Sequence, residues 1–252
     1  YAYYSGADAS IILNGDATFT NNLATGSSYG YGGAIYNYAY SSNSNANITF
    51  NGDATFTGNT ASSDGGAIYN YAYYSGADAS IILNENAAFT GNTASSGNGG
   101  AIYNYATSSN SNANITFNGD VTFTGNTASS YGGAIYNYNS GSTITFGKNS
   151  TLSFSENYAN DQRNDIYNSS GTINILGTVA SDIHLISEGG TISLKAKDVD
   201  GDGKVVYGGS YDLTNTTLDI SGDGAKEITL QNLTLNNTAL KWDVMIDSLT
   251  GS

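Results

Sequence analysis

The sequence predicts an all-β protein that folds as a right-handed parallel β-helix, and three observations favour this fold. The first is a repeat: GGAIYN occurs at 32–37, 65–70, 99–104 and 132–137, and a diverged copy, RNDIYN, occupies 163–168. The second is that apolar and polar residues alternate with a period of two within short runs of each unit, as in half-buried strands. The third is that no stretch shows the 3.6-residue period of an amphipathic helix.

The length of the repeat fits one coil of a solenoid. The isoleucine of the hexapeptide recurs with spacings of 33, 34, 33 and 31 residues, and a second motif, Phe-x-x-Asn, runs in step with it. Self-similarity at such a period indicates a solenoid, a propeller or an array, and a propeller blade usually needs four strands and about 40 residues or more. We therefore expect one three-stranded coil per 31–37 residues.

Two types of unit alternate along the chain. The segment YAYYSGADASIILN occurs at 1–14 and again at 71–84, and we call the coils that carry it A-type. The segment SSNSNANITFNGD occurs at 41–53 and again at 108–120 and marks the B-type coils. Because the two types stack on each other, a position that is apolar in one type and polar in the other is expected to face solvent.

This comparison predicts the two faces of each strand. Ile82 of an A-type coil aligns with Thr116 of a B-type coil, so this position points outward, and its neighbours Ile81 and Leu83 point inward. By the same alternation, the isoleucine of GGAIYN and the phenylalanine of Phe-x-x-Asn point inward. The tyrosine and threonine that follow them point outward.

The composition excludes several classes of protein. The chain has 7 basic and 21 acidic residues and a net charge of −14, which argues against nucleic acid and anionic membranes as partners. It has no Cys and one His, which excludes a disulfide scaffold and a multi-His metal site. No apolar run approaches the roughly 20 residues of a membrane-spanning helix, so we expect no membrane insertion by this segment.

Composition also divides the chain into two zones. No Lys or Arg precedes Lys148. The GGAIYN and Phe-x-x-Asn motifs do not recur after residue 168. We predict that residues 1–168 form the repeat β-helix and that residues 169–252 continue the same solenoid with shorter, irregular coils.

A row of tyrosines is the main candidate binding surface. If the motif isoleucines point inward, the tyrosines that follow them form exposed ladders on one face, because stacked strands place equivalent residues about 4.8 Å apart. Such ladders stabilise a sheet through cross-strand pairs and also offer an aromatic contact surface. The candidate residues are Tyr36, Tyr38, Tyr69, Tyr71, Tyr103, Tyr105, Tyr136 and Tyr138.

Asparagine and aspartate recur with the same spacing, and we assign them structural roles. The motif asparagines are expected to hydrogen-bond along the stack and to satisfy turn backbone. Asp16, Asp53 and Asp120 occupy Asn-Gly-Asp turns, with Asn86 at the equivalent place in the third coil. The two asparagine rows are Asn37, Asn70, Asn104, Asn137 and Asn168, and Asn59, Asn92, Asn126 and Asn157.

The tail contains a candidate calcium loop. Asp198, Asp200 and Asp202 match the first half of an EF-hand loop, Gly203 follows them, and Lys204 would offer its carbonyl. The bidentate glutamate of an EF-hand is absent, so weak calcium binding by an extracellular β loop is the hypothesis. We expect no other cofactor.

The pairing of GGA-Ile with Phe-x-x-Asn resembles the repeats of the chlamydial polymorphic membrane proteins and, more broadly, autotransporter passengers. The resemblance covers about residues 1–168, and it implies an extracellular role at a bacterial surface, with an outer-membrane anchor in parts not present in this chain. The implied function is that of an adhesin or a structural fibre. Partners would be a protein or glycan of a host or neighbouring cell, or the protein itself. Because the chain starts in the middle of a unit, we expect either a fragment of a longer passenger or end-to-end stacking.

Two other functions stay open at this stage. Pectin-lyase-like enzymes share the β-helix, but residues 1–147 contain no basic residue for their chemistry, and His184 is expected to lie in solvent beside Asp182. The prediction is therefore a non-catalytic protein. The second alternative is an ice-binding solenoid, because Thr18/Thr20, Thr55/Thr57 and Thr122/Thr124 form Thr-x-Thr pairs in a series that Ala88 interrupts.

Overall fold

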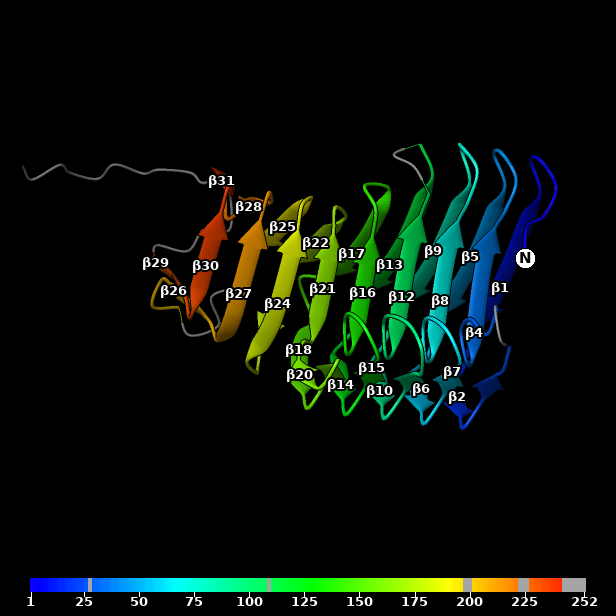
Figure 1. The fold of residues 1–252 in the computed structure, drawn as a ribbon, viewed down its shortest axis with the longest axis horizontal. Helices are drawn as coiled ribbons and strands as arrows, with labels where there is room; N and C mark the ends of the chain where they lie inside the picture. The colour runs from blue at the N-terminus through cyan, green and yellow to red at the C-terminus, as the bar shows by residue number, and fades with distance from the viewer. Residues whose placement is uncertain (27–28, 108–109, 197–200, 222–226, 242–252) are drawn as a thin grey trace, which may run out of the picture.

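The computed structural model describes residues 1–26, 29–107, 110–196, 201–221 and 227–241. These residues form strands, turns and loops and contain no helix. Equivalent strands of successive coils pair in parallel, so that the chain winds as one elongated stack (Figure 1). The predicted all-β parallel solenoid is confirmed.

The front of Figure 1 is an eight-stranded sheet, which we call the tyrosine wall. In it the GGAIYN strands pair with like residues opposite one another, so that Ile102 lies between Ile68 and Ile135. Its strands are β4 (Ile35–Ala39), β8 (Ile68–Ala72), β12 (Ile102–Ala106), β16 (Ile135–Tyr138), β21 (Ile166–Ser169), β24 (Ile183–Glu188), β27 (Gly209–Thr214) and β30 (Leu233–Asn236).

A nine-stranded sheet, the long wall, lies behind the tyrosine wall. The A-type and B-type strands alternate in it, so Asp78 pairs with Asn45 on one side and with Asn112 on the other. Its strands are β1 (Asp8–Leu13), β5 (Asn45–Phe50), β9 (Asp78–Leu83), β13 (Asn112–Phe117), β17 (Ser142–Phe146), β22 (Thr172–Ile175), β25 (Thr191–Leu194), β28 (Thr217–Asp219) and β31 (Ala239–Lys241).

Two six-stranded sheets close the lower side of the repeat zone. The threonine wall consists of β2 (Ala17–Thr20), β6 (Ala54–Thr57), β10 (Ala87–Thr90), β14 (Val121–Thr124), β18 (Thr151–Ser155) and β23 (Thr178–Val179). The short wall consists of β3 (Leu23–Ala24), β7 (Thr60–Ala61), β11 (Thr93–Ala94), β15 (Thr127–Ala128), β19 (Tyr158–Ala159) and β20 (Gln162–Arg163). Each coil of the repeat zone thus has the three expected strands and a fourth of two residues, too short for its pattern to stand out in the sequence.

The coils become shorter after the repeat zone, as the sequence predicted. The short wall ends where β20 turns back antiparallel to β19, and the threonine wall ends at β23. The tyrosine and long walls continue, and Ile166, Leu185, Tyr211 and Leu233 succeed one another in register at steps of 19, 26 and 22 residues. A further parallel pair joins β26 (Lys204–Tyr207) to β29 (Glu227–Leu230). The division at residue 168 stays a prediction.

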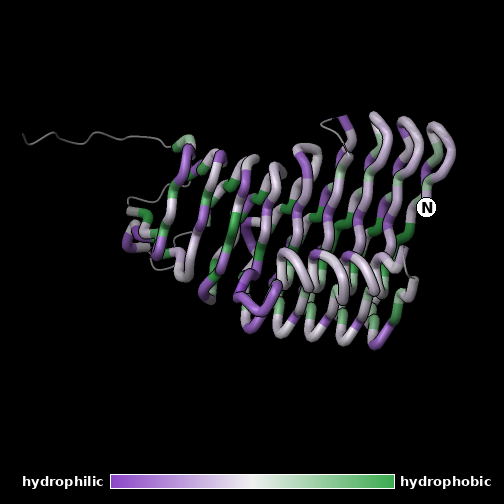
Figure 2. The backbone as a smooth tube through the Cα atoms, in the orientation of Figure 1, coloured by the Kyte–Doolittle hydropathy of each residue, from purple (hydrophilic) through white to green (hydrophobic). Residues whose placement is uncertain are grey.

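The core runs along the inside of the stack. Five phenylalanines from the threonine wall stack with ring centroids 4.7 to 5.1 Å apart. Phe50 and Phe117 of the long wall meet them edge-on, and the motif isoleucines complete the same cluster. Figure 2 shows the matching alternation of hydrophobic and hydrophilic residues along the strands. Ile81 and Leu83 are buried and Ile82 is half-exposed, so the predicted faces are confirmed.

Each of the two glycines of GGAIYN is required for a different steric reason. Gly99 has a φ of +65°, and a Cβ there would lie 2.2 Å from the Ile102 carbonyl oxygen. A Cβ on Gly100 would lie 2.1 Å from the Gly133 carbonyl oxygen of the next coil. The first glycine therefore permits the left-handed turn into the tyrosine wall, and the second lets two coils approach.

We expect Ile102→Ala to lower the free energy of unfolding by about 2–5 kcal/mol, the usual cost of truncating a fully buried aliphatic side chain. Ile102 is completely buried between two identical neighbours. Denaturant unfolding measures the loss, and Ile82→Ala on the outer face of the long wall is the matched control. An equal loss in both variants would contradict the assigned faces.

Candidate functional site

Alternation divides the side chains of the tyrosine wall between the core and the outer face. In β8, Ile68 and Asn70 point inward, whereas Tyr69 and Tyr71 belong to a separate aromatic cluster outside the core. The outward direction of the tyrosines is therefore confirmed. We call Tyr36, Tyr69, Tyr103, Tyr136 and Tyr167 the first row.

The prediction that the first row is exposed is wrong for all its members except Tyr36, which is half-buried at the first coil. Tyr69, Tyr103 and Tyr136 are only 5 to 8% exposed. The loops that lead from the short wall back to the tyrosine wall cross in front of the sheet in Figure 1, and Tyr31 from such a loop stacks on Tyr69 at 4.7 Å. Tyr131 packs against the last coils of the row in the same way. The loop side chains thus seal the first row, which stabilises the wall.

The second row remains accessible. It consists of Tyr38, Tyr71, Tyr105 and Tyr138, of which the first three are half-buried and the last is 36% exposed. Beside it lies a third row made of Tyr3, Tyr40 and Tyr73, whose rings stack at 4.8 and 5.4 Å. The neighbouring Tyr4 and Tyr74 are 77% and 46% exposed. We call the second and third rows together with Tyr4 and Tyr74 the tyrosine strip.

The rings of the second row stack face to face. Tyr38 and Tyr71 have centroids 4.9 Å apart and planes 2° apart, and Tyr71 and Tyr105 are 4.7 Å and 8° apart. Tyr71 therefore has a stacked ring on both sides, whereas Tyr138 is tilted by 37° against Tyr105 at 5.0 Å.

Burial changes the acidity of the first row. It raises the pKa of Tyr69, Tyr103 and Tyr136 well above the usual range, because the phenolate would lose its hydration. The nearby Asp64 carboxylate and adjacent tyrosines add to this shift. The first row therefore stays neutral in the folded protein.

Two buried asparagine ladders run along the stack, as predicted. In the tyrosine wall the Nδ2 of each asparagine donates to the Oδ1 of the next, over 2.8 to 2.9 Å. In the second ladder the Nδ2 of Asn59 donates both to Asn92 Oδ1 and to the Phe19 carbonyl of the preceding coil, each at 3.0 Å. The Phe-x-x-Asn motif thus combines a core ring with the amide that ties its coil to both neighbours.

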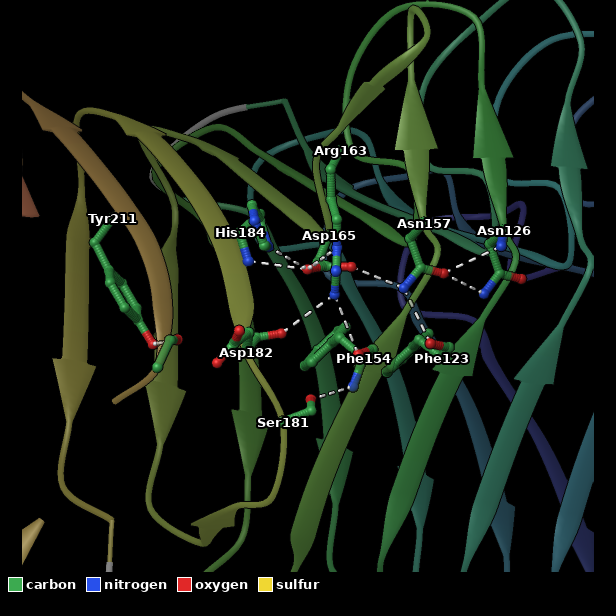
Figure 3. Close-up of polar contacts among 11 residues, drawn as sticks. Phe123, Asn126, Phe154, Asn157, Arg163, Asp165, Ser181, Asp182, His184 and Tyr211 are labelled. Carbon is green, nitrogen blue, oxygen red and sulfur yellow. Dashed lines mark hydrogen bonds and ion pairs between the residues drawn. The ribbon is translucent and has the colours of Figure 1, made fainter. Parts of the chain in front are cut away.

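The second ladder ends on a buried carboxylate (Figure 3). Asn157 Nδ2 donates to Asp165 Oδ1 at 2.8 Å, and the backbone N–H of His184 donates to Asp165 Oδ2 at 2.9 Å. Arg163 Nε and His184 Nδ1 lie 3.7 and 3.4 Å from the same Oδ2. Burial raises the pKa of Asp165 against the opposing effect of these donors.

Arg163 joins the repeat zone to the tail. Its Nη2 donates to the Phe154 carbonyl in the threonine wall at 3.4 Å and to the Asp182 carbonyl ahead of β24 at 3.5 Å. His184 was expected in solvent beside Asp182, but its side chain is 29% exposed and lies against Asp165. The arrangement is a structural joint, and nothing in it positions a nucleophile.

Sequence reasoning missed Asp165. It occupies the position equivalent to the buried Ala67, Ala101 and Ala134 of the earlier coils. The RNDIYN copy therefore replaces a core alanine with a carboxylate. This replacement of a small apolar residue at an inward position was the available signal.

The remaining candidates stay separate from the tyrosine wall. Asp16 Oδ1 accepts a hydrogen bond from the Asp53 backbone at 3.0 Å, and Asp53 Oδ1 accepts one from Asn86 at 3.0 Å, so the turn role is confirmed. On the threonine wall, Thr18 and Thr55 face outward in register with Ala88, and ice binding stays a prediction.

The calcium hypothesis also stays a prediction. Asp198 and Asp200 lie outside the described residues. Asp202 is exposed and its Oδ1 accepts a hydrogen bond from the Lys204 backbone at 2.8 Å. Among the residues that the structure describes, no three His, Cys, Asp or Glu side chains lie together as metal ligands would.

The fold and the surface define a class of protein, a repetitive parallel β-solenoid with an aromatic outer wall. The family model of the Chlamydia polymorphic membrane protein repeat matches residues 16–38, 53–71, 82–105 and 120–138. The predicted resemblance is thereby confirmed: the repeat zone carries four segments that are similar to this family's repeat. No curated protein and no solved structure matches the chain. Within the described ranges, no helix has the length and apolar character to cross a membrane.

We expect Asp165→Ala to fold, since alanine occupies the equivalent position in the four other coils of the repeat zone, but to loosen the joint. Asn157 Nδ2 and the His184 N–H would lose their acceptor, and an unsatisfied buried polar group costs about 1–3 kcal/mol. Denaturant unfolding and the rate of native trypsin cleavage at Arg163 measure the effect. Asp212→Ala, at an exposed position of the tyrosine wall, is the control, and equal losses in the two variants would refute the joint.

Alkaline titration tests the sealed first row. Because folding raises these tyrosine pKa values, their contribution to stability is complete below the unfolded value of about 10 and is lost as pH rises through the folded values. We expect tyrosinate absorbance from the first row to appear together with loss of the β circular dichroism signal. In a Tyr69→Phe, Tyr103→Phe, Tyr136→Phe variant the unfolding should move to higher pH. Unchanged unfolding in this variant would count against burial of the row.

Proposed function

We propose that this chain is a non-catalytic segment of a surface adhesin and that the tyrosine strip is its contact surface. Two findings support the general class: the matched repeat type and the solenoid fold. The adhesive role rests on the surface itself.

The observation that carries the proposal is the continuity of the strip. It extends over both A-type and B-type coils from Tyr3 to Tyr138, although the loops beside it differ in sequence and length. Core packing accounts for the inward isoleucines but does not require tyrosine on the opposite side of the same strands. Exposed aromatic area with hydroxyl groups at its margin is typical of contact surfaces.

The distinction between rows gives the proposal its internal control. The first row is sealed by loops, so it contributes stability without contact. The second row has the same residue type on the same strands but remains accessible. A contact function therefore predicts different effects for two sets of tyrosines that lie two residues apart.

We expect Tyr38→Thr, Tyr71→Thr, Tyr105→Thr and Tyr138→Thr together to reduce cell attachment about tenfold or more while the solenoid persists. Threonine keeps β propensity, and each lost cross-strand pair costs only about 0.2–1 kcal/mol. Attachment of chain-coated beads to a panel of cultured cells, measured together with thermal unfolding, tests this. The variant with three first-row Tyr→Phe changes should attach normally. Attachment that survives in the threonine variant would refute the proposal.

A further inference from the structure

The outer face of the long wall carries a row in which aspartates alternate with asparagines. Asp8, Asn45, Asp78 and Asn112 are the first residues of β1, β5, β9 and β13, and they pair in register. The Asn45 Nδ2 donates to Asp8 Oδ1 at 2.6 Å, and the Asn112 side chain hydrogen-bonds to the Asp78 carboxylate. Each asparagine of the row therefore binds the aspartate of the coil before it.

The row is interrupted between Asp78 and Asn45. An ionised carboxylate has acceptors only, so Asp78 cannot donate to the preceding coil as an asparagine amide would. Among the described residues, nothing donates a hydrogen bond to Asp78 Oδ1, although this atom is shielded from solvent. Such an oxygen disfavours the charged form of the group, because hydration is lost and no hydrogen bond replaces it. Burial accordingly raises the pKa of Asp78, and the hydrogen bond from Asn112 opposes this rise only in part.

Charged neighbours do not surround Asp78. The paired strands β5 and β13 share the sequence NANITF and contain no titratable side chain. The turn before Asp78 contributes only the phenols of Tyr73 and Tyr74, and the tyrosines of β4 and β8 lie on the outer face of the tyrosine wall. The other carboxylate of the row, Asp8, lies beyond Asn45. No Lys or Arg precedes Lys148, so no cation balances the Asp78 charge within the repeat zone before that residue.

We propose that Asp78 is a pH-dependent contact between two coils, in which its carboxyl group takes up a proton from solvent as pH falls and donates the new O–H to the side-chain oxygen of Asn45. The proton supplies the one donor that the row lacks between Asp8 and Asn112. Acidification therefore tightens the contact between β5 and β9, whereas the ionised form leaves it incomplete. This inference is independent of the tyrosine strip.

The direction of the pH dependence follows from linkage. The folded-state pKa of Asp78 is raised above the unfolded value of about 3.9, so protonation favours the folded chain. The stabilising contribution of Asp78 is complete below the unfolded value and is lost as pH rises through the folded value.

A titration of the folded full chain tests the protonation directly. With aspartate labelled by carbon-13, the carboxyl resonance of Asp78 is identified as the one missing from Asp78→Asn. We expect its midpoint above the unfolded value of about 3.9. A midpoint at or below that value would overturn the proposal.

Denaturant unfolding at several pH values tests the consequence for stability. Asp78→Asn supplies a permanent donor and introduces the residue that B-type coils have in this register, at Asn45 and Asn112, so the fold accommodates it. We expect this variant to unfold at higher denaturant concentration than the wild type at neutral pH, and the difference to narrow as pH falls. Asp8→Asn is the matched control, because Asp8 lies in an identical 14-residue segment but is exposed. A difference that does not change with pH, or that is the same in both variants, would contradict the proposal.

A second variant separates the hydrogen bond to Asn45 from burial alone. Asn45→Leu keeps Asp78 covered but removes the acceptor for its proton. We expect the midpoint of the Asp78 titration to fall by about 0.5–1 pH unit, which corresponds to the loss of one ordinary hydrogen bond from the protonated form. An unchanged or higher midpoint would show that burial alone acts on Asp78 and would refute the contact with Asn45.

Discussion

Hydrogen bonds between stacked asparagine amides hold consecutive coils in one register, and the rest of the structure depends on that register. Each amide donates to the next coil, and in the second ladder it also donates to a phenylalanine carbonyl of the coil before. Because these groups are buried, a slip by one residue would leave donors and acceptors unsatisfied along the whole row. The fixed register then stacks phenylalanine on phenylalanine in the core and tyrosine on tyrosine outside it.

A ladder of this kind has a direction, and its direction explains the diverged fifth motif. The donor groups point toward later coils, so the last amide, Asn157, needs an acceptor that no further asparagine provides. Asp165 supplies it at the point where the short wall ends at β20. Arg163 partly balances the carboxylate and reaches the first turn of the tail. The changes to Arg163 and Asp165 in the fifth motif therefore close the repeat zone.

Much of the fold was predictable because the repeat exposes the constraint on each position. Comparison of Ile82 with Thr116 separated inward from outward residues, and the structure agrees. The burial of Tyr69 was not predictable, because it depends on a loop ring, Tyr31, that reaches it through chain geometry without a periodic signal. The role of Asp165 was not predicted for a related reason, since Asp165, Asn157 and His184 belong to three different chain segments that meet only in space.

The same register that stabilises the repeat zone also determines how its surface is arranged. Stacking places Tyr71 between Tyr38 and Tyr105 and aligns the tyrosines of the second row along the wall. Alternation of A-type and B-type coils places aspartate opposite asparagine in the long wall, so negative charge recurs at every second coil. Adjacent aspartates in every coil would repel one another at strand spacing. Alternating charge on the long wall and continuous tyrosine rows on the tyrosine wall are therefore two consequences of the same register.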